Sequence, residues 1–192
     1  MAAQTDSSAP PGIATAKVAI LENEIGEVSV DSSVFSGLAG VGAGGAGGGI
    51  QLRELFSGCV CCSLAGELVD AVRDLQATVH PEWLIIEATG LAIPESAADL
   101  LRKAITDLEG LLTVVLVDAA RFSVLEKISP LIGKQPKTAD VLLLNKVDLV
   151  DEAVRGQVTS RLREINASAS ILEVVASEPI AQDVLAEMIK GA

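Results

Sequence analysis

The chain has 192 residues, of which 49% are hydrophobic and only 2% aromatic, and its formal net charge is −12. A chain of this length can bury one core, and its aliphatic composition is typical of α/β proteins with buried strands. The excess of carboxylates repels phosphate backbones, which excludes nucleic acid as an expected partner. Three cysteines cannot form a fully paired disulfide framework, so a reducing, cytoplasmic location is expected.

The chain is expected to consist of a short disordered segment and one domain. Residues 1–15 are small, polar and proline-bearing, which predicts disorder. They have no basic region with an apolar segment, so no signal peptide is expected. No apolar run reaches the roughly 18 residues of a membrane span, and no membrane contact is expected. Residues 16–192 form the predicted domain, within which residues 37–49 hold eight glycines and predict a flexible loop.

Strands and helices are predicted to alternate along the domain. Short aliphatic runs indicate strands, and apolar residues at helical spacing indicate helices. A further helix is expected to begin at Pro94. This alternation favours parallel βαβ units and therefore an α/β fold. The predicted strands are residues 17–21, 50–55, 83–87, 112–118, 141–144 and 170–175, and the other predicted helices are residues 66–79, 150–166 and 181–190.

All three cysteines lie in one short segment, Gly58-Cys59-Val60-Cys61-Cys62. Thiolates are soft ligands, and three of them this close can face one Zn²⁺ or Cu⁺ ion, with one further donor completing a tetrahedral site. Two other interpretations stay open at this point. The cysteines can pack as small buried hydrophobic side chains, or they can serve as redox thiols, with a strained bond between Cys61 and Cys62.

Other polar groups follow the first predicted strand and the only histidine. Glu22, Glu24 and Glu27 lie at the carboxyl end of that strand, where open α/β sheets bind ligands, although a solvated acidic loop has the same composition. His80 stands at the end of a predicted helix, before Pro81. We expect it to cap the helix or lie on the surface rather than bind a metal.

Two motifs follow later strands. In Asn145-Lys146-Val147-Asp148, the carboxylate can accept the N1–H and the exocyclic amine of guanine, a pair that adenine does not offer. The asparagine can bond the base edge, and the lysine stem can lie over the ring. In Glu87-Ala88-Thr89-Gly90, the carboxylate can orient an attacking water or hold Mg²⁺-bound water, and the glycine amide can approach a γ-phosphate. An ordinary βα turn is the alternative for the second motif.

Four motifs in this order resemble the CobW-like metal-handling GTPases (CobW/HypB/UreG), relatives of the hydrogenase and urease nickel-insertion GTPases. The resemblance implies a P-loop NTPase-like, three-layer αβα fold with a mostly parallel sheet. The matching segments are residues 17–27 with the family's strand and Asn-Glu-Phe-Gly-Glu segment, 58–62 with its Gly-Cys-x-Cys-Cys signature, 87–94 with its Glu-x-Thr-Gly-Leu-Ala-x-Pro, and 145–148 with its guanine-specificity motif.

The resemblance implies a GTP-linked metal chaperone that delivers a transition metal to a client protein or cofactor pathway, with cobalamin synthesis and zinc homeostasis both within the family. Zn²⁺ is the implied metal, although Co²⁺, Ni²⁺ and Cu⁺ also suit thiolates. GTP and Mg²⁺ are the implied cofactors. The implied roles are metal binding for Cys59, Cys61, Cys62 and Glu24, guanine binding for Asn145, Lys146 and Asp148, and γ-phosphate and Mg²⁺ contacts for Gly90 and the catalytic Glu87.

The sequence departs from the family pattern at both ends. It contains no Gly-x-x-x-x-Gly-Lys-Ser/Thr phosphate loop, and it stops near the end of the GTPase domain, before the family's smaller C-terminal domain. On this resemblance residues 16–192 are a truncated GTPase domain that lacks its central first strand. We therefore expect unpaired sheet edges, which a second copy or a partner could complete. GTP hydrolysis stays open, and so do two alternatives: a non-catalytic metal-binding or interaction module, and a non-functional fragment.

Overall fold

A computed structural model describes residues 17–24, 51–56, 64–88 and 94–190. The chain divides into two units, Met1–Ala92 and Ile93–Ala192, each held together by its own contacts. The predicted disordered segment 1–15, the glycine-rich segment 37–49, the three cysteines and Gly90 lie outside the described residues. The predictions made for those segments therefore stay predictions.

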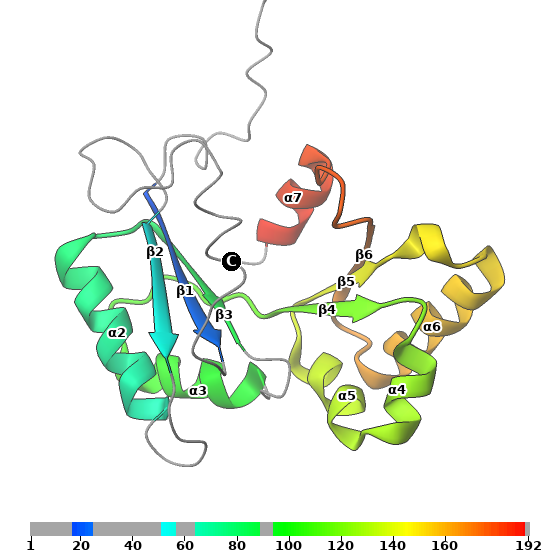
Figure 1. Ribbon diagram of the computed structural model, residues 1–192, viewed down its shortest axis with the longest axis horizontal. Helices are drawn as coiled ribbons and strands as arrows, with labels where there is room; N and C mark the ends of the chain where they lie inside the picture. The colour runs from blue at the N-terminus through cyan, green and yellow to red at the C-terminus, as the bar shows by residue number, and fades with distance from the viewer. Residues whose placement is uncertain (1–16, 25–50, 57–63, 89–93, 191–192) are drawn as a thin grey trace, which may run out of the picture. The chain divides into compact units, whose positions relative to one another are not determined.

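The described part of the first unit is a three-stranded parallel sheet with one helix (Figure 1). Its strands are β1 (Val18–Glu24), β2 (Gln51–Phe56) and β3 (Trp83–Glu87), in the order β2-β1-β3. The central strand β1 carries the apolar run that buries Ala19, Ile20 and Leu21. Because all three strands are parallel, their carboxyl ends lie at one edge of the sheet.

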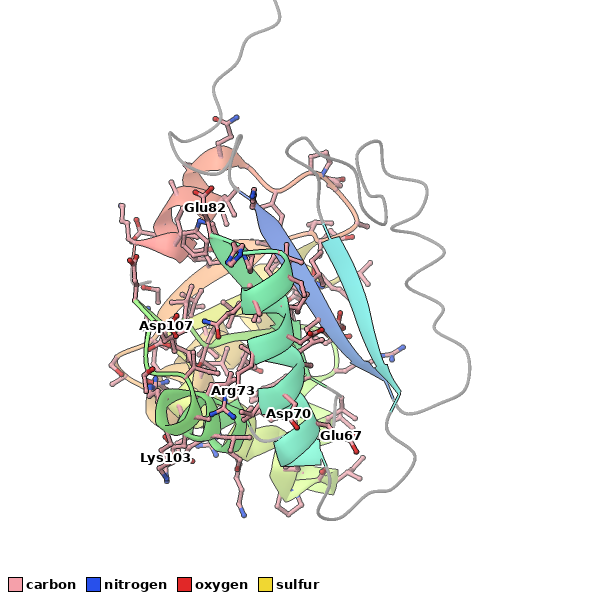
Figure 2. The ribbon with its side chains drawn as sticks, turned by 90° about the vertical axis from the view of Figure 1, so that its left-hand side faces the viewer. Glu67, Asp70, Arg73, Glu82, Lys103 and Asp107 are labelled. Carbon is pink, nitrogen blue, oxygen red and sulfur yellow. The ribbon has the colours of Figure 1, made fainter. Side chains whose placement is uncertain are left out.

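Helix α2 (Leu64–Thr78) joins β2 to β3 and is amphipathic. Its buried residues Val69, Val72 and Leu75 recur every three positions, which places them on one side of the helix. Glu67, Asp70 and Arg73, labelled in Figure 2, belong to its exposed residues. The helix that the apolar spacing predicted is therefore present. It supplies the crossover connection that parallel strands require.

The helix α2 ends where the chain turns into a left-handed conformation. The backbone N–H groups of Val79 and His80 both donate to the carbonyl of Leu75, at 2.9 and 3.2 Å. His80 has a φ of 51°, which is uncommon for a residue other than glycine, and it is exposed. Its place at the helix end agrees with the predicted cap or surface role.

The second unit contains another three-stranded parallel sheet, in the order β4-β5-β6. The strands are β4 (Val114–Asp118), β5 (Val141–Asn145) and β6 (Ser170–Val174). The helices are α3 (Pro94–Ala104), α4 (Phe122–Ile128), α5 (Pro130–Lys134), α6 (Glu152–Ile165) and α7 (Gln182–Ile189), with the 3₁₀ turns η1 (Gln135–Thr138) and η2 (Val147–Leu149).

Both faces of the central strand β5 are buried, which explains its unbroken aliphatic sequence. Leu142 and Leu144 point into a core that includes Val158 and Leu162 of α6 and Phe122 of α4. The alternate residues of β5, Val141 and Leu143, pack with Val174 on the opposite face, where Val184 and Met188 of α7 cover them. Helices therefore cover both faces of this sheet, as a parallel α/β arrangement requires.

The α/β fold class with parallel pairing is confirmed, and every predicted strand is present with small shifts at its ends. The predicted strand 112–118 is shorter and begins at Val114. Helices α4 and α5, between β4 and β5, were not predicted. In the described residues the strands form two sheets, because β3 pairs only with β1 and β4 pairs only with β5. No helix in the described ranges is long and apolar enough to cross a bilayer.

Candidate functional site

Polar residues of the second unit gather where β4 and β5 end. The strand register places Asp118, the last residue of β4, beside Asn145, the last residue of β5. The N–H of Ala119 donates to the carbonyl of Asn145 at 2.9 Å, which continues the ladder one step beyond β4. The aliphatic strands therefore hold the polar residue that ends each strand at a defined place on the edge of the sheet.

The side chain of Asn145 ties two segments of this edge together. Its Oδ1 accepts a hydrogen bond from the backbone N–H of Lys146 at 2.8 Å and another from the N–H of Ala176 at 2.9 Å. Ala176 lies in the loop after β6. One amide oxygen thus fixes the turn after β5 and the loop after β6, and leaves the Asn145 amide nitrogen as a donor.

Lys146 is fixed at both ends of its side chain. Its backbone is left-handed, with φ 62° and ψ 36°, a conformation that costs free energy in residues other than glycine. Its ammonium Nζ donates to Oδ2 of Asp118 at 2.9 Å. The side chain of Lys146 is 45% exposed and that of Asp118 is 22% exposed, so the lysine side chain is partly open to solvent although its ammonium is paired.

Asp118 is itself held by the turn that follows β4. Its Oδ1 accepts hydrogen bonds from the N–H groups of Ala120 and Arg121, at 3.0 and 3.1 Å. Burial alone raises the pKa of this carboxyl group. The hydrogen bond and charge of Lys146 and the two backbone donors outweigh burial, and the net pKa lies below its ordinary value. The two oxygens of the Asp118 carboxylate therefore bind different partners: Oδ1 accepts from the backbone, and Oδ2 accepts from Lys146.

Asp148 lies in η2, directly after this cluster, and is exposed. Among the described residues, no hydrogen bond or ion pair engages its carboxylate. The structure thus brings Asn145, Lys146 and the unpredicted Asp118 together and leaves the predicted base-reading carboxylate of Asp148 available to a ligand.

The other predicted site residues belong to the first unit. The backbone of Glu24 ends β1 beside Phe56, the last residue of β2, and Glu87 ends β3 beside Glu22 of β1. Glu87 is exposed, and no interaction with another described residue engages it. No cluster of three metal-ligating side chains occurs within the described ranges, but the cysteines lie outside them. The predicted metal site is therefore untested.

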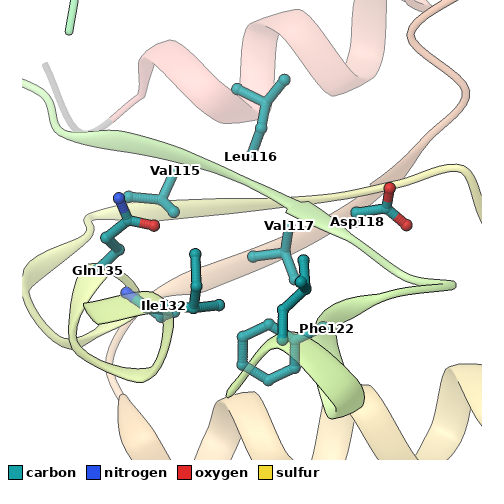
Figure 3. Close-up of a pocket in the computed structure, with 9 residues that line it drawn as sticks. Val115, Leu116, Val117, Asp118, Phe122, Ile132 and Gln135 are labelled. Atoms are coloured by element: carbon teal, nitrogen blue, oxygen red, sulfur yellow. The ribbon is translucent and has the colours of Figure 1, made fainter. Parts of the chain in front are cut away.

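A hollow of about 130 Å³ lies along β4, on the side of α4 and α5 (Figure 3). Val115, Val117, Phe122 and Ile132 contribute hydrophobic side chains to its lining, and Asp118 is the one ionisable residue of that lining. The hollow is small and mainly apolar, so it does not provide the charged groups that a phosphate would need. The polar edge, rather than this hollow, is the candidate site.

Sequence reasoning placed Asp118 at the end of a strand but gave it no role, and it did not single out Ala176. A signal for Asp118 was present, because a lone carboxylate that ends an aliphatic strand lies at the ligand-binding edge of a parallel sheet. Ala176 contributes only its backbone N–H, so its side chain gives no sequence signal for this role.

Parallel strands with polar residues at their carboxyl ends define an α/β domain of the ligand-binding kind. Residues 13–173 match the family model described as "CobW/HypB/UreG, nucleotide-binding domain", and the chain belongs to this family.

Several curated relatives are described as zinc chaperones. The "Zinc chaperone YjiA" of Escherichia coli is 33% identical over 170 residues, which cover 82% of this chain and 48% of the relative. The "Zinc chaperone CobW" of a Sinorhizobium species is 31% identical over 175 residues, covering 76% of this chain and 48% of the relative. The chain thus spans about half the length of the curated relatives that it matches.

Solved structures share the fold. Zn(II)-bound YjiA GTPase from E. coli superposes with a TM-score of 0.57 at 20% identity, over 88% of this chain and 60% of that one. The hydrogenase maturation factor HypB from Archaeoglobus fulgidus gives a TM-score of 0.56 at 21% identity, over 92% of this chain and 75% of that one. At these identities the likeness shows the fold, which is that of the predicted P-loop NTPase-like class.

Proposed function

We propose that this chain is the nucleotide-binding domain of a GTP-linked metal chaperone, with Zn²⁺ as its cargo. Family membership is the observation that carries the proposal. The curated relatives described as zinc chaperones support the choice of metal. The carboxylates and cysteine thiolates of the sequence are ligands that suit Zn²⁺, and they also suit Co²⁺, Ni²⁺ or Cu⁺.

The guanine-binding residues are proposed to be Asn145, Lys146 and Asp148. The unengaged carboxylate of Asp148 accepts the N1–H and exocyclic amine of guanine. The amide nitrogen of Asn145, which no other described residue engages, donates to an acceptor on the base edge. The stem of Lys146, whose side chain is partly exposed, lies over the ring. The support is geometric: these residues follow one strand, and the polar edge holds the first two in place.

The metal ligands are proposed to be Cys59, Cys61 and Cys62, with Glu24 as a fourth. The support is the register of the first unit, in which β2 ends beside Glu24 and leads in sequence to the cysteines. Three thiolates and one carboxylate make a tetrahedral donor set that Zn²⁺ accepts. Thiolates must stay reduced to bind, which fits a cytoplasmic location. A client protein that receives the metal is the proposed partner.

Catalysis is proposed at the end of β3, where Glu87 orients water or holds Mg²⁺-bound water and Gly90 approaches the γ-phosphate. The sequence contains no phosphate loop. A second candidate rests on the cysteine segment alone: a metal-binding module that does not use nucleotide.

Isothermal titration of the reduced chain with Mg²⁺–GTP, with and without Zn²⁺, tests both candidates. We expect saturable GTP binding that Asp148→Ala weakens strongly and that Asp70→Ala, which removes an exposed carboxylate of α2, leaves unchanged. We also expect stoichiometric Zn²⁺ that is lost when all three cysteines become serine and kept in His80→Ala. Tight Zn²⁺ binding with no heat at millimolar GTP would favour the second candidate, and unchanged zinc content in the serine variant would refute the metal site.

A further inference from the structure

Asp118 links a rigid strand to the lysine of the proposed guanine site. We propose that Asp118 is a positioning residue for nucleotide binding: it holds the Lys146 ammonium so that the lysine stem forms a preformed shelf for the purine ring. The inference rests on the proposed function and extends it to a residue of another strand. Loss of the Asp118 carboxylate is therefore expected to weaken the affinity for every guanine-like base without changing which base is preferred.

The first support is that Asp118 cannot easily turn away from Lys146. Two backbone N–H groups of its own turn hold Oδ1, and this leaves Oδ2 directed at the ammonium. The residue ends β4, where Val117 is buried in the core. The carboxylate is therefore a fixed point, unlike the exposed carboxylates of long side chains that form weak surface ion pairs.

The second support is that Lys146 is held at its other end as well. Its left-handed backbone and the hydrogen bond of its N–H to Asn145 fix the start of the side chain, and Asp118 fixes its end. A free lysine side chain loses conformational entropy when it is ordered against a ligand. A stem that is ordered before the ligand arrives avoids that cost at binding, which is the general benefit of preorganisation.

The third support is the division of tasks along the edge. Asp148 carries a carboxylate with no described partner, so it is free to read the guanine edge, whereas the carboxylate of Asp118 is already occupied by Lys146 and two backbone donors. Removal of the Asp148 carboxylate should change the selectivity between bases. Removal of the Asp118 carboxylate should change only the affinity for the nucleotide. This difference separates a positioning role from a contact with the base.

The test is an NMR titration of the full chain, which measures affinities into the millimolar range, with GTP and with ITP, whose base lacks the exocyclic amine. We expect Asp118→Asn to weaken the affinity for both nucleotides by about 10-fold, because the cation–π contact and the prior ordering of one lysine are lost. The ratio of the GTP affinity to the ITP affinity should stay unchanged. Asp148→Ala is expected to lose that ratio instead. Asp140→Asn is the matched control, since Asp140 also accepts a backbone N–H, from Thr113 at 2.7 Å, and its substitution removes the same charge.

A double-mutant cycle completes the test. Lys146→Met keeps an apolar stem but has no ammonium, so adding Asp118→Asn to it should cause no further loss. An unchanged affinity in Asp118→Asn, or the same loss with and without the lysine, overturns the inference while the proposed function stands. A wild-type chain that binds neither nucleotide at millimolar concentration overturns the proposed function and the inference together.

Discussion

At the scale of single residues, Asn166 shows how a buried polar side chain can be fully satisfied. Its exposed fraction is 6%, yet its Nδ2 donates to the carbonyls of Pro136 and Ala139, both at 2.9 Å. Its Oδ1 accepts from the N–H and hydroxyl of Ser168 and from the N–H of Ala169. One side chain thereby joins the end of α6 to the segment before β5 and to the start of β6.

We expect Asn166→Ala to lower the free energy of unfolding by about 3 kcal/mol, because buried carbonyl and N–H groups lose their partners. Urea denaturation at neutral pH measures the change. Ser168→Ala is the control: it removes one of these hydrogen bonds and should cost about 1 kcal/mol. Equal losses in the two variants would show that the hydrogen bonds of Asn166 other than the one from the Ser168 hydroxyl do not stabilise the fold.

Candidate site residues could be proposed from sequence where the side chain itself carries the chemistry. Asn145, Lys146 and Asp148 have donors and acceptors that suit a guanine ring, and their place after an aliphatic strand was visible in the sequence. The bond between Lys146 and Asp118 was not, because the two residues are far apart in sequence and meet only through the register of β4 and β5. The bond of Asn145 to Ala176 depends in the same way on the path of the chain after β6.

At the scale of elements, the helical spacing of apolar residues predicted α2, whose 15 residues are long enough for the pattern to be recognised, and α6 and α7 also lie where helices were expected. Helices α4 and α5 are short, at seven and five residues, and a window of 11 or more residues does not resolve them. Only the joint packing of Phe122 and Ile132 under the sheet defines this region. Tertiary contacts, rather than local propensity, decide such short helices.

An ion pair also connects elements that the sequence does not relate. Arg161 of α6 donates to both carboxylate oxygens of Glu126 in α4, with the shortest distance, from Nη2 to Oε1, at 2.6 Å. The hydrogen bond to Glu126, followed by that to Glu164, raises the pKa of the Arg161 guanidinium. The pair lies at the surface, so its main consequence is the relative orientation of α4 and α6 rather than a large gain in stability.

The end of α2 provides a test of backbone strain. His80→Val should lower the melting temperature, because a β-branched side chain at a φ of 51° is more strained than histidine, by roughly 1 kcal/mol. His80→Gly should be neutral or stabilising, since glycine adopts positive φ at no steric cost. Thermal unfolding followed by circular dichroism distinguishes the two variants. Equal melting temperatures would mean that α2 ends differently from the structure described above.

At the scale of the whole molecule, the second unit has a core of its own. The buried residues that surround β5 come from β4, α4, α6 and β6, all within Ile93–Ala192. A segment with its own hydrophobic core can fold independently. We therefore expect residues 93–192, produced alone, to unfold cooperatively in urea and to keep the Asp118–Lys146 contact, observed as a lysine Nζ resonance that shifts in Asp118→Asn. A non-cooperative transition would contradict this expectation.

The sheets raise a different question at the same scale. Within the described residues, β4 is paired on one side only, and its Leu116 is 62% exposed. Unpaired sheet edges were expected from the resemblance to the family, and that expectation stays a prediction. Periodicity alone does not supply it, since it identifies strands but not their neighbours. A second copy or a partner strand that pairs there stays a prediction.

The amide oxygen of Asn145 has a consequence for solvent exchange. Ala176 is exposed, and an amide in such a loop would ordinarily trade its hydrogen for deuterium almost at once. The N–H of Ala176 donates to Oδ1 of Asn145, with 2.9 Å between nitrogen and oxygen. Its hydrogen therefore exchanges only when this hydrogen bond opens. The exchange lifetime of the amide hydrogen of Ala176 thus reports how often the corner where β5 and β6 end opens, and it does so without any ligand.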